Sequence, residues 1–153
     1  MGAVIDPWDC IALGKAATIR SRYRTAEFYF ESSLSTFQDN NDLEGQAQSM
    51  DYLGRVLRYL GKDEESRVLH DKALEIFRQI DNRKGEADAL NNLANILRGN
   101  AIHEAKSIYL ESLEIRREIE DYRGIAASLH NLGLVADRPV SYTHLTLPTK
   151  RIV

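Results

Sequence analysis

The stretch that decides the fold reads MDYLGRVLRYLGKDEESRVLHDKALEIFRQI over residues 50–80. Its apolar residues recur three or four positions apart, as at Leu69, Ala73 and Ile76, which is the spacing of one face of an α-helix. The pair Gly61-Lys62 interrupts this spacing halfway, at a point where a turn would reverse the chain. The stretch therefore predicts two helices that form an antiparallel hairpin.

The same pattern recurs along the chain at a nearly fixed interval. The pairs Leu13-Gly14, Leu53-Gly54, Leu93-Ala94 and Leu132-Gly133 lie 40, 40 and 39 residues apart. Glycines at the unit junctions recur in step, at Gly45, Gly85 and Gly124. A single hairpin carries apolar residues on two faces and cannot cover both, so copies stack side by side to build a continuous core.

These observations predict an all-α protein, an α-solenoid of antiparallel helical hairpins with about seven helices. Strand patterns are absent. The expected helices span residues 8–20, 23–40, 44–59, 63–81, 85–98, 101–120 and 124–137. After a lead-in at 1–7, the repeat domain is expected over 8–138, with units at about 5–44, 45–84 and 85–123 and a partial unit at 124–138.

Within each unit, large and small residues follow an order that resembles the tetratricopeptide repeat (TPR). In the second unit the matching positions are Met50, Leu53, Gly54, Leu57, Ser66, His70 and Ala73, and His70 stands where the family has an aromatic residue. The third unit matches with one residue lost near Arg98-Gly99. Each unit is about six residues longer than the usual repeat. In this the chain is similar to kinesin light chain arrays and to the TPR regions of bacterial signalling ATPases and transcription regulators.

The resemblance implies a right-handed superhelix whose first helices line a concave groove that binds proteins or peptides. It implies a scaffold and not an enzyme, with no cofactor. The alternative is a regulatory or sensor segment of a multidomain signalling ATPase or transcription regulator whose catalytic or DNA-binding domain is missing. Flanking sequence would separate the two hypotheses.

By position in the repeat, the expected groove residues are Asp51, Arg55, Arg58, Asp88, Asn91, Asn92, Asn95, Arg98, His130 and Asn131. An amide both donates and accepts hydrogen bonds, which suits the backbone of an extended peptide. The arginines could contact acidic side chains. In the alternative interpretation, Asn92 and Asn131 bridge adjacent repeats and serve only the fold.

Composition excludes several function classes. The formal net charge is -3 with both signs interspersed, which favours neither nucleic acid nor a membrane surface as partner. Cys10 is the single cysteine, which argues against a disulfide framework and for the cytoplasm. No two histidines stand at metal-ligand spacing, and phosphate-loop and nucleophile-elbow motifs are absent. Trp8 and Phe28 are expected in core or N-terminal packing.

The C-terminal stretch does not continue the pattern. Residues 140–149, VSYTHLTLPT, resemble the translation of a transposase-type sequencing adapter, so we expect 139–153 to be a non-native tail and the chain to be a fragment of a larger protein. The alternative is a native terminus. The fourth unit then lacks its second helix, which leaves an apolar face around Leu129, Leu132 and Val135 and predicts possible self-association.

Overall fold

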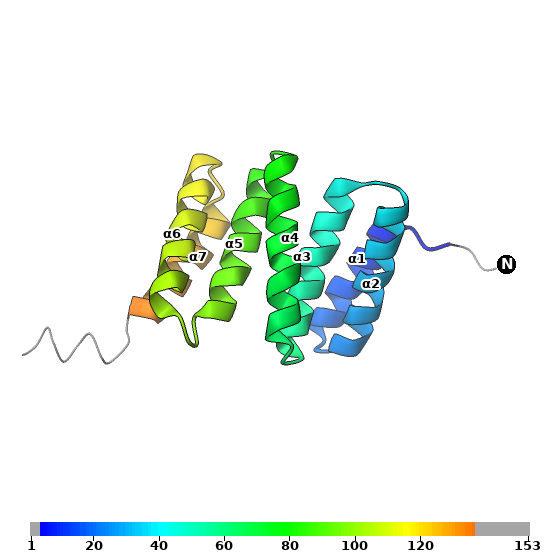
Figure 1. Cartoon of the computed structure of the whole chain (residues 1–153), viewed down its shortest axis with the longest axis horizontal. Helices are drawn as coiled ribbons and strands as arrows, with labels where there is room; N and C mark the ends of the chain where they lie inside the picture. The colour runs from blue at the N-terminus through cyan, green and yellow to red at the C-terminus, as the bar shows by residue number, and fades with distance from the viewer. Residues whose placement is uncertain (1–3, 137–153) are drawn as a thin grey trace, which may run out of the picture.

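A computed structural model describes residues 4–136, and their regular structure is entirely helical (Figure 1). The helices are α1 (Pro7–Ile19), α2 (Tyr23–Asp39), α3 (Leu43–Tyr59), α4 (Asp63–Gln79), α5 (Arg83–Leu97), α6 (Ile102–Glu118) and α7 (Tyr122–Ala136). Every expected helix is present, with bounds that differ from the prediction by at most two residues. The predicted all-α solenoid is confirmed.

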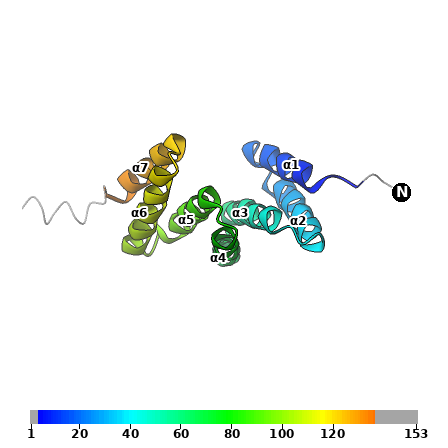
Figure 2. The same cartoon turned by 90° about the horizontal axis from the view of Figure 1, so that it is seen from above.

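The helices form two layers of an arch. Seen from above, α1, α3, α5 and α7 line the inner, concave side, and α2, α4 and α6 lie on the outer side (Figure 2). Helices α1 and α7 stand at the two ends of the array. Within residues 4–136, no helix is long and apolar enough to cross a membrane.

Glycine in the repeated Leu-Gly pair allows the two helices of a hairpin to approach closely. A Cβ atom built on Gly14 would lie 2.5 Å from Cε1 of Phe30, and one on Gly54 would lie 2.7 Å from Nε2 of His70. Both distances are shorter than carbon contacts allow, so the ring from the second helix occupies the place of the missing side chain. The aromatic position of the repeat therefore fills the space that the glycine leaves.

Most turns use one residue in the left-handed backbone region. Ser21, Asn41, Asp81 and Glu120 have φ angles of 57°, 55°, 57° and 56°, and Gly61 has 79°. The amide that follows bonds back across the helix end, as Arg22 N–H does to the Ala17 carbonyl at 2.9 Å, which satisfies a carbonyl that the helix leaves unpaired. The turn between α5 and α6 has no positive φ angle among the described residues. The single spacing of 39 arises because α5 has 15 residues where α3 has 17, while this turn is one residue longer than the turn between α3 and α4.

Three expectations about apolar residues have different outcomes. Trp8 contacts Phe37 edge-on, with ring centroids 4.8 Å apart, as expected of N-terminal packing. Phe28 is 64% exposed, so its expected place in the core was wrong; it lies on the outer layer, away from the partner helix. Val135 is also not on an open face, because it is buried in a cluster with Leu97 and Tyr109.

The adapter-like residues 140–149 lie outside the described residues.

Candidate functional site

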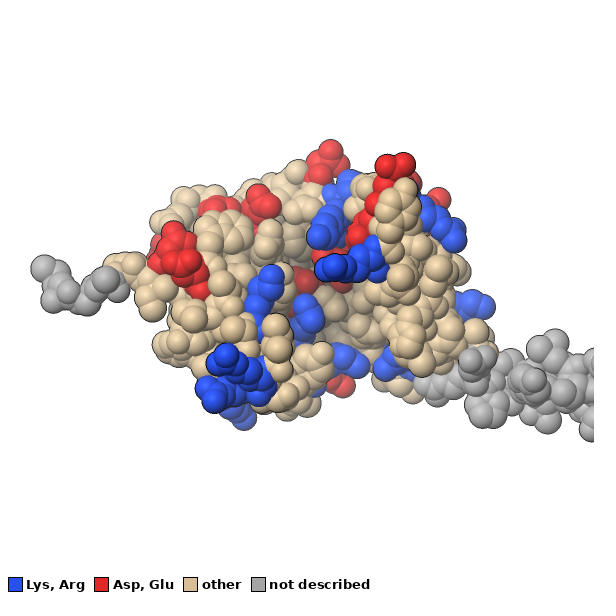
Figure 3. All heavy atoms as spheres, turned by 180° about the vertical axis from the view of Figure 1, so that it is seen from behind, with Lys and Arg blue, Asp and Glu red and all other residues tan. Residues whose placement is uncertain are grey.

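The concave face contains a pocket of about 290 Å³ between α3 and α5. Figure 3 looks into this hollowed face, where Lys and Arg side chains gather near the middle. The pocket is lined by Asp51, Tyr52, Arg55, Arg58, Tyr59, His70, Asp88, Asn91, Asn92, Asn95 and Arg116. Seven of the ten expected groove residues are thus brought together, and Arg98, His130 and Asn131 are outside this lining.

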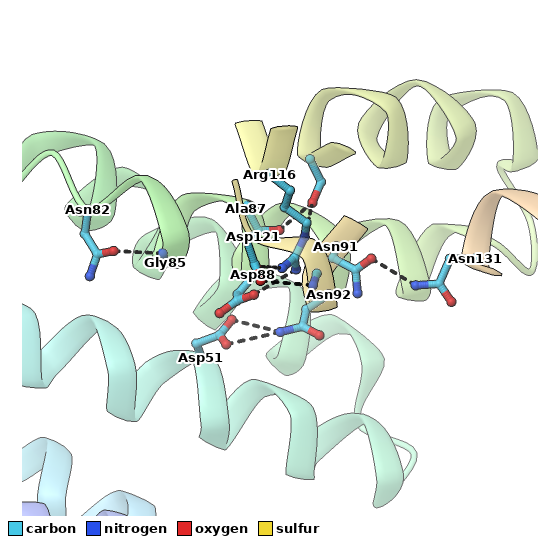
Figure 4. A network of polar contacts seen from close by, with 12 residues as sticks. Asp51, Asn82, Gly85, Ala87, Asp88, Asn91, Asn92, Arg116, Asp121 and Asn131 are labelled. Carbon is cyan, nitrogen blue, oxygen red and sulfur yellow. Dashed lines mark hydrogen bonds and ion pairs between the residues drawn. The ribbon is translucent and has the colours of Figure 1, made fainter. Parts of the chain in front are cut away.

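The asparagines connect neighbouring repeats. Asn92 Nδ2 on α5 donates to both carboxylate oxygens of Asp51 on α3, at 3.1 Å each (Figure 4). One unit further on, Asn131 Nδ2 on α7 donates to Oδ1 of Asn91 on α5 at 2.9 Å. The two bonds join equivalent positions of successive units. This geometry supports the interpretation in which Asn92 and Asn131 serve the fold.

A buried histidine supplies a second donor to Asp51. His70 Nδ1 lies 2.8 Å from Asp51 Oδ1, and both residues are buried. A carboxylate only accepts, so the hydrogen of this bond is on Nδ1. Donors from α4 and α5 therefore converge on the Asp51 carboxylate, so its oxygens are hydrogen-bonded within the fold. Sequence reasoning missed this pair; the available signal was a histidine at an aromatic position of a hairpin whose first helix carries Asp51.

Arg116 was also missed, because it belongs to a second helix and was not assigned to the groove. Its side chain is 7% exposed and donates to Asp88 Oδ1 and to Asp121 Oδ2, both at 2.8 Å. Burial raises the pKa of the Asp88 carboxyl, and the Arg116 charge opposes this rise. The amide of Gly124, and then Arg116, hold the pKa of Asp121 below its ordinary value. Both acids are thus compensated from inside the protein.

Two arginines in the pocket lack such compensation. Neither Arg55 nor Arg58 forms an ion pair with an acidic side chain within residues 4–136. Arg55 is exposed, and its Cζ lies 5.9 Å from the centroid of the Tyr52 ring. Lys15 Nζ on α1 lies 5.4 Å from the same centroid. Two cations thus lie near one aromatic ring, and one of them, Arg55, also lines the pocket.

Internal bonds also fix how two amides are oriented. Tyr109 donates its hydroxyl hydrogen to Oδ1 of Asn95 at 2.6 Å, and Asn131 donates to Oδ1 of Asn91 at 2.9 Å. Burial raises the pKa of Tyr109, which keeps this phenol protonated as a donor. Each oxygen accepts one of these bonds, and the NH₂ groups of Asn91 and Asn95 can donate to a ligand. The pocket therefore offers these amide donors beside the guanidinium groups of Arg55 and Arg58, while Oδ2 of Asp88 remains an acceptor.

The residues that the structure describes include no group of three or more His, Cys, Asp and Glu side chains that could hold a metal ion. Stacked helical hairpins with a polar inner groove define the class of α-solenoid repeat proteins.

Comparison with known proteins places the chain within that class. Two family models described as "Tetratricopeptide repeat" match residues 43–101 and 87–120, which together span half of the 153 residues. The chain belongs to the tetratricopeptide-repeat family. Among solved structures, the crystal structure of BtubC (BKLC) from P. vanneervenii is similar, with a TM-score of 0.74 and 21% identity over 84% of this chain and 54% of that chain. This chain thus spans about half the length of that structure. No curated protein sequence matches it.

Proposed function

We propose that this chain is a protein-binding module whose concave groove holds an extended acidic segment of another protein. Tetratricopeptide repeats are protein-interaction scaffolds, and the class of partner follows from the charges in the groove. The observation that carries the proposal is the pair Arg55 and Arg58, two guanidinium groups that line the pocket with no carboxylate of the described chain to pair with. Carboxylates of a bound partner would form ion pairs with these two guanidinium groups.

The other pocket groups favour the same ligand. The NH₂ groups of Asn91 and Asn95 donate, and so do both guanidinium groups, which suits a ligand rich in acceptors. An extended peptide offers backbone carbonyls to the amides and acidic side chains to the arginines. A guanidinium binds a carboxylate through two parallel hydrogen bonds, which adds geometric specificity to the charge.

A labelled peptide in which glutamate alternates with serine tests the proposal by fluorescence anisotropy. We expect it to bind the whole chain, whereas the peptide with glutamine in place of glutamate should bind weakly. The double variant Arg55→Ala, Arg58→Ala should weaken binding by about tenfold for each arginine, since a hydrogen bond to a charged group contributes about 1.5 kcal/mol or more. Added salt should weaken the wild-type complex.

The matched control removes the same charge elsewhere. Arg67 on α4 and Arg117 on α6 are exposed and form no ion pair in the described structure, so Arg67→Ala, Arg117→Ala has the same net charge as the groove variant. This control should leave affinity unchanged. Equal losses of affinity in both double variants would mean that peptide binding depends only on net charge, and the groove assignment would be wrong.

A second test uses the amide donor. Asn95→Ala combined with Arg55→Ala should weaken binding without unfolding the array. Unchanged affinity with an unchanged melting curve would argue that the groove is not the binding site.

A second candidate function is a regulatory segment of a larger signalling ATPase or transcription regulator. This candidate comes from the resemblance of the repeats to the TPR regions of such proteins. Sequencing the gene on both sides of the chain, including codons 137–153, tests it. A nucleotide-binding or DNA-binding domain beside the repeats would support this candidate, whereas further repeats would support a scaffold. We propose the cytoplasm as the compartment because the sequence has one cysteine.

A further inference from the structure

We propose that the outer side of the array carries a second binding site, a groove between α2 and α4 that receives a short basic segment of another protein. Figure 2 shows α3 lying between these two outer helices, and each of them packs against α3 much more than against the other. The space between them, called the outer groove below, has a volume of about 340 Å³.

The base of the outer groove is apolar. Leu53 and Leu57 of α3 line it, and each is only 5% exposed, so they lie at its bottom. Val68 and Leu69 of α4 form part of its wall, and Val68 is 51% exposed. An aliphatic side chain of a partner would contact these residues and remove the exposed valine from water. The outer groove therefore suits a leucine or isoleucine side chain.

The charged residues of the outer groove are mainly acidic. Glu27 and Glu31 of α2 and Glu65 of α4 contribute three carboxylates. Lys62 contributes the one positive charge of the lining. Glu31 and Glu65 are exposed and form no ion pair within residues 4–136. Lysine or arginine side chains beside the inserted aliphatic residue would meet these two carboxylates, so the charges of the two surfaces are complementary.

Glu27 adds a buried charge that the fold compensates only in part. Its Oε2 atom is buried and accepts no hydrogen bond from the described residues. The two cations nearest to its carboxylate are Arg24 at 3.5 Å and Lys62 at 3.8 Å, and the Arg24 side chain is 74% exposed. Buried carboxylate oxygens are normally hydrogen-bonded, and a further positive charge in the outer groove would stabilise this one.

The next groove along the array, between α4 and α6, has a different composition. In the repeat register Arg67 takes the place of Glu27, and Ser107 takes the place of Val68. A cation thus replaces the buried acid, and a hydroxyl replaces the exposed apolar side chain. The combination of an apolar base and an acidic rim therefore belongs to the outer groove and is not a general feature of the repeat.

The outer groove and the concave pocket prefer ligands of opposite charge. The two sites share no lining residue, and the concave pocket holds the guanidinium groups of Arg55 and Arg58. A basic segment in the outer groove would leave these arginines accessible from the concave side. The array could therefore hold a basic and an acidic segment at the same time, and the outer groove does not depend on the acidic ligand proposed above.

Fluorescence anisotropy with the whole chain tests the charge preference. The probe is a labelled peptide with one leucine between two pairs of lysines and a serine at each end. Glu31→Gln, Glu65→Gln should weaken its binding by about tenfold, because two carboxylates of the rim lose their charge. The matched control Glu104→Gln, Glu114→Gln changes two exposed glutamates of α6 that form no ion pair in the described structure, and it should leave affinity unchanged.

The apolar contact is tested separately from the charge. Val68→Ser should weaken binding by about threefold, and a peptide with serine in place of leucine should lose at least as much, because both remove apolar contact area. Circular dichroism should show an unchanged fold, since Val68 is half exposed and Ser107 occupies the equivalent position of α6. The control Leu110→Ser, at a leucine of α6 that is 48% exposed, should bind the peptide like the wild type.

Three results would overturn the proposal: no binding of the basic peptide to the wild type, equal losses in the two glutamate double variants, or full affinity in Val68→Ser. Binding of the acidic peptide should be unchanged in Glu31→Gln, Glu65→Gln and in Val68→Ser. Saturating acidic peptide should also leave the basic peptide bound. Failure of the outer groove is thereby distinguished from failure of the function proposed for the concave pocket.

Discussion

The same substitution at two equivalent positions of the repeat should change stability in opposite directions. Gly54 and Gly133 each follow a leucine in a first helix, but Gly54 lies beneath the His70 ring and Gly133 lies beside open space. We predict that Gly54→Ala destabilises the protein and that Gly133→Ala stabilises it.

The magnitudes follow from two terms. Replacing glycine by alanine inside a helix contributes about 1 kcal/mol of stability at either position, since glycine loses more backbone entropy on folding. At Gly54 the new methyl group would lie 2.7 Å from His70 Nε2 and 2.8 Å from Cε1, and the buried ring must move. Overpacking of this kind costs about 1–3 kcal/mol. The net effect at Gly54 is a loss of up to about 2 kcal/mol, and the difference between the two variants is the overpacking cost itself.

Urea unfolding followed by circular dichroism measures both variants, at a concentration low enough to keep the chain monomeric. The expected order of midpoints is Gly133→Ala above wild type and wild type at or above Gly54→Ala. Because repeat arrays can unfold in stages, amide exchange within α7 gives a local measure of the Gly133 effect. Equal midpoint shifts in the two variants would refute the reasoning, since the ring contact would then have no energetic effect.

Three further substitutions test the turn, the pH response and the repeat junction. Glu120→Gly should stabilise the protein by about 1 kcal/mol, seen as a higher urea midpoint, because Glu120 has a φ angle of 56° and glycine adopts this region without steric cost. The lowered pKa of Asp121 stabilises the fold above about pH 4, the ordinary aspartate range, and this contribution is lost as pH falls through the folded-state pKa. Asp121→Asn should therefore flatten the acid side of a stability–pH curve, and an unchanged slope would contradict the assignment. Asn92→Ala should cost about 1–3 kcal/mol in urea unfolding, because it removes a donor from the buried Asp51 carboxylate; a smaller loss would mean that water replaces the amide.

The helices were predictable because their signals are local or periodic. Leu53-Gly54 and its repeats fix the period, and polar turn residues such as Asn41 and Asp81 mark helix ends in the left-handed region. A packing pattern repeated in each unit reinforces itself, so an ambiguity in one unit is resolved by the next. Phe28 is an exception, because a large apolar residue on an outer helix can remain exposed.

The polar contacts were less predictable because the repeat pattern fixes which helices pack together but not which polar side chains bond across a hairpin. The residues His70 and Asp51 are 19 apart, and Arg116 and Asp88 are 28 apart. Position in the repeat indicated that Asp51 and Asp88 belong to the groove, but not that each has a donor from a second helix. The prediction of an acidic partner therefore depends on a difference visible only in three dimensions: the aspartates are paired and Arg55 is not.

The asparagine bonds between repeats bear on how an array of this kind can change its length. Asp51 and Asn91 are acceptors at successive junctions, and Asn92 and Asn131 are the matching donors, so the two junctions are interchangeable. Deleting residues 53–92 would keep Tyr52 beside Phe30 and Lys15 and bring Asn131 opposite Asp51. Whole hairpins can thus be lost or duplicated with each new junction still complementary, and the groove can shorten or lengthen in steps of one repeat.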